Sequence, residues 1–272
     1  MCRGVVLALT LAACRLHFDE LGDAGGQDSL GAFSAPQPIP GANTGADEQD
    51  PVMTSNGREL TFSLVAAQKD LYVMQRDAGG GFSAPVPVTF DDPAGDDAAP
   101  RLSPDDLTLW FGSTRAGSAA EDVWTTTRTA IGGVWTAPVQ FAQVNSPQVE
   151  NWLSICGDGH YVLVRELALF EGVLGGAAPQ PIAELNVSGY ESGALLMADC
   201  TTLYFSSEQA GDRDLYVAHR AAPVAPWQPA QPLTELNVAG ADEEDPWLSA
   251  DERTVIFASS RAGSFDLYIA TR

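Results

Sequence analysis

The chain has 272 residues, of which 45% are hydrophobic and 18% charged, and its formal net charge is −22. This apolar fraction excludes a disordered chain, because it is large enough to build a core. The charge argues against a nucleic-acid partner, since phosphate binding needs a basic face and Lys69 is the only lysine.

Residues 1–13 predict a secretory signal peptide, in which Arg3 precedes a short apolar stretch that ends in small residues. The sequence Leu11-Ala12-Ala13-Cys14 resembles the lipobox of bacterial lipoproteins. This resemblance implies cleavage before Cys14 and a lipid on that cysteine. The alternatives are an ordinary cleaved signal and an apolar N-terminus in which the cysteine occurs by chance. Arg15 in the next position resembles lipoproteins that are sent to the outer membrane.

Residues 14–30 predict a flexible tether, because they contain acidic and glycine positions without a sustained period. Beyond residue 13 no run of 18 or more apolar residues occurs. We therefore expect the chain to meet the membrane only through the lipid anchor, on the bacterial cell envelope.

The rest of the chain, residues 31–272, contains five copies of one pattern. In each copy a cluster of turn-forming residues precedes an alternating apolar run, which predicts a turn followed by a half-buried strand. The anchors of these runs recur at spacings of 49, 53, 41 and 52 residues: Phe62, Phe111, Val164, Phe205 and Phe257.

Further strands are expected around each of these runs. Four copies continue into a second apolar run that begins with aspartate and ends with arginine, at residues 70–76, 122–128, 214–220 and 266–272. Proline-rich segments between the copies predict edge strands, since proline cannot donate a ladder hydrogen bond. With the short strand before each turn cluster, the pattern predicts four antiparallel strands per unit, which is the repeat of a β-propeller blade.

The fifth copy lacks a proline-rich outer strand, whereas an unmatched strand of this kind occurs at residues 31–40. If the N-terminal strand completes the last blade, the ring closes and no edge is left exposed. The sequence therefore predicts an all-β, five-bladed β-propeller of four-stranded blades, closed by its N-terminal strand.

The fifth copy also carries the clearest family resemblance. Residues 245–272 (DPWLSADERTVIFASSRAGSFDLYIATR) resemble the TolB-like, WD-repeat-like propeller repeats of bacterial envelope proteins. This resemblance implies contact with an envelope protein partner, but it identifies no particular one. We expect the propeller itself to be a monomer.

An acidic residue occurs at the start of the innermost strand in all five copies: Glu48, Asp97, Glu150, Glu191 and Glu243. Strand parity predicts a ring of carboxylates near the axis on one face. Three interpretations are open: hydrogen bonds that fix blade geometry, a site for a hard cation such as Ca²⁺, or ligand recognition. Because no EF-hand-type loop is present, we expect no cofactor unless Ca²⁺ occupies this ring.

The third copy departs from the pattern, because one connecting loop is almost absent and Trp152 and His160 have no counterparts in the aligned copies. A missing loop could leave a notch that holds a ligand, although drift of a tolerant repeat is the favoured explanation. Cys156 and Cys200 fall at equivalent turns of neighbouring copies, which suggests either a disulfide or two separate buried thiols.

The leading hypothesis is an envelope-anchored lipoprotein whose propeller is a non-enzymatic protein-binding or scaffold module. No metal-binding His/Cys spacing, nucleophile elbow, Walker loop or dinucleotide fingerprint is present. The alternative is a glycosidase-type enzyme or a carbohydrate-binding propeller, because glycoside hydrolysis needs only two carboxylates about 5–10 Å apart. The five ring acids are the candidates for that pair.

Overall fold

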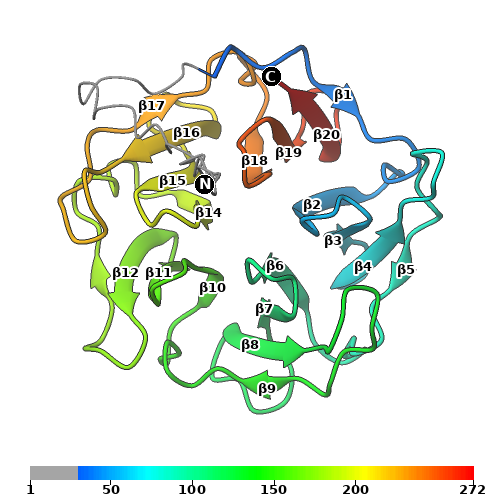
Figure 1. The fold of residues 1–272 in the computed structure, drawn as a ribbon, viewed down its shortest axis with the longest axis horizontal. Coiled ribbons are helices and arrows are strands. Elements are labelled where there is room, and N and C mark those ends of the chain that lie inside the picture. Colours follow the sequence, from blue (N-terminus) through cyan, green and yellow to red (C-terminus); the bar gives the residue numbers. More distant parts are fainter. Residues whose placement is uncertain (1–29) are drawn as a thin grey trace, which may run out of the picture. The chain divides into compact units, whose positions relative to one another are not determined.

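The computed structural model describes residues 30–272. The predicted signal peptide, Cys14 and the tether up to residue 29 lie outside the described residues. Among residues 30–272 there are twenty β-strands, and no helix there could cross a membrane. These strands form five four-stranded antiparallel sheets around a common axis (Figure 1). The predicted five-bladed β-propeller is therefore confirmed.

Every blade has the same strand order from the axis outwards. The innermost strands are β2 (Asp47–Met53), β6 (Asp97–Leu102), β10 (Glu150–Ile155), β14 (Glu191–Leu196) and β18 (Glu243–Leu248). The second strands are β3 (Glu59–Val65), β7 (Thr108–Ser113), β11 (His160–Arg165), β15 (Thr202–Ser207) and β19 (Thr254–Ser259).

The third strands are β4 (Lys69–Gln75), β8 (Asp122–Thr127), β12 (Ala168–Val173), β16 (Asp214–His219) and β20 (Asp266–Thr271). The outer strands are β5 (Val86–Pro87), β9 (Val139–Gln140), β13 (Gln180–Pro181), β17 (Gln231–Pro232) and β1 (Gln37–Pro38). Each outer strand has only two residues, as expected where proline limits the ladder to an edge.

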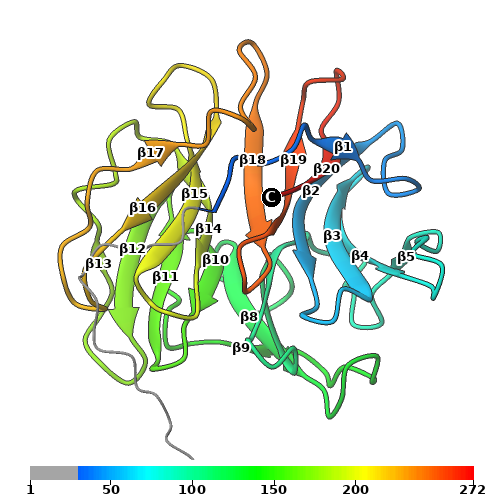
Figure 2. The same cartoon turned by 45° about the horizontal axis from the view of Figure 1, so that its top comes forward.

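The ring closes in blade 5, where β1 pairs with β20 and the sheet order is β1-β20-β19-β18 (Figure 2). The backbone N–H groups of Ser34 and Ile39 donate to carbonyls of Thr271 and Leu267 on either side of this pairing. The side chain of Ile39 is buried between blades 5 and 1. The predicted sharing of the last blade between the two ends of residues 31–272 is thus confirmed.

The apolar core consists of five clusters, each filling the space between two neighbouring blades. Four of the predicted anchors, all phenylalanines on second strands, are fully buried in these clusters: Phe62, Phe111, Phe205 and Phe257. The anchor predicted in blade 3 is wrong by one residue. There Leu163 pairs with Phe170 as Phe205 pairs with Tyr216, because the turn before β11 is one residue shorter and shifts Val164 to the other face.

The arginine that ends the third strand of four blades holds the outer layer in place. Its guanidinium stacks on an aromatic ring of the proline-rich segment, in the pairs Arg76–Phe82, Arg128–Trp135, Arg220–Trp227 and Arg272–Phe33. Arg128 and Arg220 also form ion pairs with Glu59 and Glu171 of the preceding blade. The repeated arginine therefore joins the outer strand to its own blade and to the preceding one.

Candidate functional site

The five ring acids are fully buried, at 0% exposure, and all of them accept hydrogen bonds from the loop that leads into their strand. The donors include the backbone N–H groups of Thr44, Asp92, Ser146, Ser188 and Val238. An arginine also pairs with three of the acids: Arg115 with Asp97, Arg165 with Glu150 and Arg261 with Glu243. These contacts favour the first of the three interpretations, in which the acids fix the loops to the blades.

A different set of residues lies at the axis. Each innermost strand contains a β-bulge two residues after its ring acid, and the residue there has a positive φ. The five residues are Asp50, Ala99, Trp152, Gly193 and Asp245. They contact one another between blades, since Asp50 N–H donates to Asp245 Oδ2 at 3.3 Å and Ala99 N–H to Asp50 Oδ2 at 3.2 Å. The bulges therefore turn these positions towards the centre of the ring.

Three of these axial residues form, with two cationic neighbours, what we call the axial cluster: Asp50, Trp152 and Asp245 with Lys69 and Arg101. Lys69 Nζ lies 2.8 Å from Asp50 Oδ2, and the indole N–H of Trp152 donates to Asp50 Oδ1 at 3.1 Å. The side chain of Asp50 is thus fully buried, but both of its carboxylate oxygens have a hydrogen-bond or ion-pair partner. Its sequence neighbourhood is acidic, but only the bulge shows that it faces the only lysine of the chain.

The two axial carboxyl groups have opposite pKa shifts. Burial would raise the pKa of Asp50, but the ammonium group of Lys69 and several hydrogen bonds lower it to about 2. Burial, together with the negative charges of Asp50 and Glu244, raises the pKa of Asp245 well above its usual range. Asp245 Oδ1 has no hydrogen-bond partner among the described residues. The two axial carboxyls therefore differ in how readily they hold a proton, with Asp245 favouring the protonated form more than Asp50 does.

Arg101 crosses the axis from blade 2 to blade 4. Its guanidinium donates to the carbonyls of Gly193 at 3.1 Å and Ala194 at 3.1 Å, and to that of Pro100 at 2.9 Å. Only 1% of this side chain is exposed. Burial lowers its pKa, while the nearby Asp245 and Asp50 oppose that shift. Arg101 is thus a buried cation held by three carbonyl groups and balanced by the axial carboxyls.

A pocket of about 140 Å³, which Arg101 helps to line, lies between the innermost strands; we call it the axial pit. The pit lies on the face that carries the turns between first and second strands. Each innermost strand contributes an apolar side chain to it: Val52, Leu102, Ile155, Leu195 and Trp247. It is a mostly apolar cavity built by all five blades, and sequence analysis did not identify it, because no single repeat contains it.

The structure does not bring Trp152 and His160 together in a notch. Trp152 lies at the axis near the start of β10, whereas His160 begins β11 at the opposite end of the blade. The missing loop of blade 3 is a tight hairpin in which Glu166 and Leu167 both have positive φ. Both residues do have counterparts in the structure. The pairing register places His160 in the position of Thr202 and Thr254, and Trp152 occupies the positive-φ position of its innermost strand.

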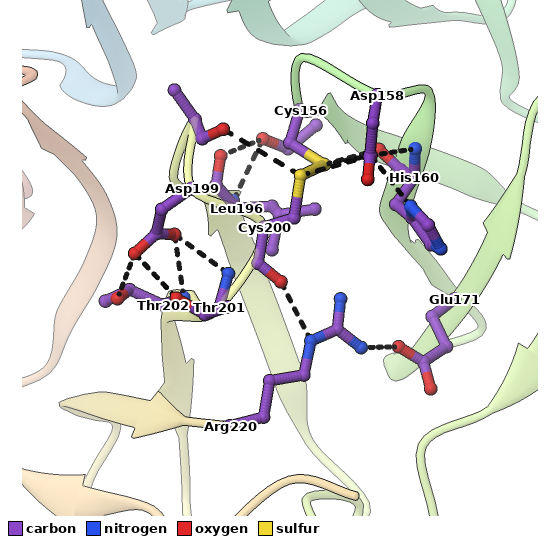
Figure 3. Close-up of a disulfide and its surroundings, with 12 residues drawn as sticks. Cys156, Asp158, His160, Glu171, Leu196, Asp199, Cys200, Thr201, Thr202 and Arg220 are labelled. Atoms are coloured by element: carbon purple, nitrogen blue, oxygen red, sulfur yellow. Dashed lines mark hydrogen bonds and ion pairs between the residues drawn. A yellow bond between two sulfur atoms is a disulfide. The ribbon is translucent and has the colours of Figure 1, made fainter. Parts of the chain in front are cut away.

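The sulfur atoms of Cys156 and Cys200 form a disulfide between the turns of blades 3 and 4 (Figure 3). Each of these turns precedes the second strand of its blade. Both cysteines are 3% exposed and belong to the apolar cluster between these blades. The bond closes a loop of 44 residues in sequence.

We expect reduction of this disulfide, or the double substitution of Cys156 and Cys200 by alanine, to lower the free energy of unfolding by about 2–4 kcal/mol. The physical reason is that a cross-link over a loop of this length restricts the unfolded chain. Urea denaturation of oxidised, reduced and substituted protein measures the effect. Equal midpoints for the oxidised and reduced proteins would contradict it.

The stability of the protein is expected to increase as the pH falls from 7 to about 5. Burial raises the pKa of Glu48, Glu243 and Glu244, and burial with the charges of Asp70 and Asp97 raises that of Asp91 to about 6. The folded state therefore binds more protons than the unfolded state in this range, so its stability is lost as the pH rises through these raised values. Asp50, with its lowered pKa, opposes this only below about pH 4.

Denaturation midpoints at pH 5, 6 and 7 check this prediction, and Asp91→Asn should flatten the slope near pH 6. A protein more stable at pH 7 than at pH 5 would show that the sign is wrong.

Comparison with known proteins identifies only the fold. The sequence matches no protein-family model and no curated protein. Among solved structures, the catalytic domain of the GH62 α-L-arabinofuranosidase of Coprinopsis cinerea is similar over 89% of this chain and 97% of that one, with 15% identity and a TM-score of 0.62. An endo-arabinase from Bacteroides thetaiotaomicron is similar over 88% and 97%, with 14% identity and a TM-score of 0.55.

TolB from Acinetobacter baumannii is similar over 84% of this chain, with 11% identity and a TM-score of 0.50. The matched part covers 55% of that TolB, so this chain spans about half of its length. At such identities the likeness shows a shared architecture and no shared chemistry. The chain is a five-bladed β-propeller, and the solved structures to which it is similar include two enzymes and a TolB protein.

Proposed function

We propose that this protein is a lipoprotein of the bacterial envelope, anchored in the outer membrane through Cys14, whose propeller binds a protein partner without catalysing a reaction. The observation that carries this proposal is the burial of the axial carboxyls: Asp50 is 0% and Asp245 1% exposed. A catalytic carboxyl must touch its substrate, and neither of these groups reaches solvent.

The axial pit is the surface that we assign to the partner. Its walls are mostly apolar, with Arg101, Asp106 and serine hydroxyls among them, its size suits one or two side chains of a binding segment, and five strands hold it in shape. Leu102, Ile155 and Leu195 in its walls are only partly buried, so they are available for contact. Burying such side chains against a partner contributes the apolar part of a binding free energy.

Capture from native envelopes, followed by mass spectrometry, tests this assignment with matched variants. Leu195→Arg places a charge in the axial pit, whereas Val224→Arg places one at a position that is 82% exposed and does not line it. We expect one reproducible partner with the wild type and with Val224→Arg, and its loss with Leu195→Arg at unchanged melting temperature. Retention of the partner by Leu195→Arg would exclude the pit as the binding surface.

The lipid anchor has a test of its own. Metabolic labelling with a radioactive fatty acid should mark the wild type, and Cys14→Ser should abolish the label. If the two proteins are labelled equally, the lipoprotein assignment fails while the binding function of the propeller stands.

A glycosidase is the second candidate, and one observation favours it. The pKa of Asp50 is lowered by Lys69 while that of Asp245 is raised by burial and neighbouring negative charges, and glycoside hydrolysis uses two carboxyl groups whose pKa values are shifted apart in this way. Glu121, which is partly exposed, accepts a hydrogen bond from Asn151, the neighbour of the axial Trp152, at 3.3 Å, and burial raises the pKa of Glu121.

The enzymes of similar fold suggest the substrates for a test: arabinose-containing polysaccharides. We expect no sugar release by the wild type beyond that of heat-denatured protein. Release that is lost in both Asp50→Asn and Glu121→Gln, with each variant still folded, would replace the proposed scaffold with the enzyme.

A further inference from the structure

A group of metal-ligating side chains lies around the disulfide, away from the axis. Asp158 Oδ1 lies 3.3 Å from Cys156 Sγ and 3.2 Å from Cys200 Sγ (Figure 3). The three ligand atoms lie within 4.8 Å of one another. His160 Nδ1 is 2.7 Å from the same oxygen of Asp158. Two sulfurs, a carboxylate and an imidazole thus meet at the junction of blades 3 and 4.

The repeat explains part of this arrangement. In blades 2 and 5 the aspartate at the same turn position, Asp105 or Asp251, accepts a hydrogen bond from a serine hydroxyl two residues earlier. Blade 3 has Cys156 in place of that serine. The position of Asp158 is therefore an ordinary feature of the turn.

The repeat does not explain why a second sulfur, that of Cys200, also lies beside Asp158. Cys200 occupies the positive-φ position in the turn of blade 4 and directs its side chain at the same oxygen. In the disulfide neither sulfur carries a proton, so neither can donate to the carboxylate, whose Oδ1 instead accepts from the backbone N–H of His160 at 3.1 Å. In the dithiol form the same three atoms are two thiols and a carboxylate, a donor set that suits zinc.

We propose that the reduced protein binds one Zn²⁺ ion through Cys156, Cys200 and Asp158, with water in the fourth position and His160 orienting Asp158. A dithiol reductant transfers two electrons and two protons to the disulfide and is itself oxidised to a disulfide. Zn²⁺ then replaces the two thiol protons, which are released to solvent. Asp158 is exposed, so the ion can enter from the turn face, which carries the hairpins between first and second strands.

The backbone geometry accommodates the ion. Two thiolates around a tetrahedral zinc ion lie about 3.7 Å apart. The Cα atoms of Cys156 and Cys200 are 5.5 Å apart, so rotation of the two side chains can reach that separation without moving the blades. The junction would then keep a cross-link in both redox states, covalent when oxidised and metal-mediated when reduced.

The test uses the purified chain, reduced with dithiothreitol and freed of it without exposure to air. Co²⁺, a spectroscopic probe for zinc sites, is titrated into the reduced and the oxidised protein. We expect the reduced protein to bind one equivalent with a thiolate-to-cobalt absorption band, to lose that band on addition of Zn²⁺, and to melt at a higher temperature with Zn²⁺. The oxidised protein should show no band.

Variants assign the ligands. Cys156→Ser with Cys200→Ser should abolish the band, Asp158→Asn should weaken binding 10- to 100-fold, and His160→Ala should weaken it about 10-fold. Asp251→Asn, the matched turn position of blade 5, should leave affinity unchanged. The proposal is overturned if the reduced wild type binds no more Co²⁺ than the oxidised protein, or if Asp158→Asn and Asp251→Asn behave alike. The comparison of the two redox forms stands even if a cysteine variant does not fold.

Discussion

Deleting residues 31–40 is expected to open the ring and to lower the free energy of unfolding by about 5 kcal/mol. The deletion removes the pairing of β1 with β20, the buried side chain of Ile39 and the ring of Phe33 that stacks on Arg272. Burial of two large apolar side chains contributes about 1.5–3 kcal/mol each, and the lost hydrogen bonds add to this. Urea denaturation of the truncated and full chains measures the difference.

A permuted chain provides the control. In the permuted chain, residues 31–40 are moved from the N-terminal end of the propeller to follow Arg272. A linker as long as the segment between Arg220 and Trp227 in blade 4 joins them. If the N-terminal strand acts only by completing the sheet, this chain should regain most of the lost stability. A truncated protein that unfolds at the same urea concentration as the full chain would disprove closure by this strand.

Replacing Lys69 with methionine is expected to destabilise the protein by about 3–5 kcal/mol. The substitution keeps much of the apolar stem but leaves Asp50, which is fully buried, without its ammonium partner. An unpaired charge in the interior must either remain unsolvated or take up a proton, and both outcomes cost free energy. Denaturant unfolding at pH 7 measures the loss.

A double-mutant cycle separates the ion pair from other effects of the substitution. Asp50→Asn combined with Lys69→Met removes both charges, so we expect it to cost less than the sum of the two single substitutions. Arg253→Met, at an exposed position, should change the stability by no more than about 0.5 kcal/mol. Additive single and double effects would mean that Lys69 and Asp50 do not depend on each other.

The internal repeat allowed the blades to be predicted from the sequence, but it did not predict the axial cluster. A turn followed by an alternating run is a local signal, and its recurrence indicated five units and the place of the outer strands. Register within a unit was less certain. The shorter turn before β11 displaced the predicted anchor from Leu163 to Val164, because a change of one residue moves a side chain to the other face of a strand.

The ring acids were found from their regular spacing, and the hydrogen bonds of the structure show what they contact. A search for residues that recur in every copy finds the ring acids but cannot find positions that differ between blades. The axial set contains two aspartates, an alanine, a tryptophan and a glycine, so no repeat pattern marks it. The signal available in the sequence was that Asp50 and Asp245 both occur two residues after a ring acid, in a chain with a single lysine.

The sequence by itself determined the class of fold, the number of blades and the strand that closes the ring, because a repeat of about fifty residues recurs five times and the outer strand missing from its fifth copy occurs at residues 31–40. Only the tertiary structure decided which side chains meet at the centre. A bulge in each innermost strand shifts the alternation by one position and turns Asp50, Trp152 and Asp245 towards the axis. Their contacts join residues from different blades, and the axial pit exists only once all five blades have closed around it.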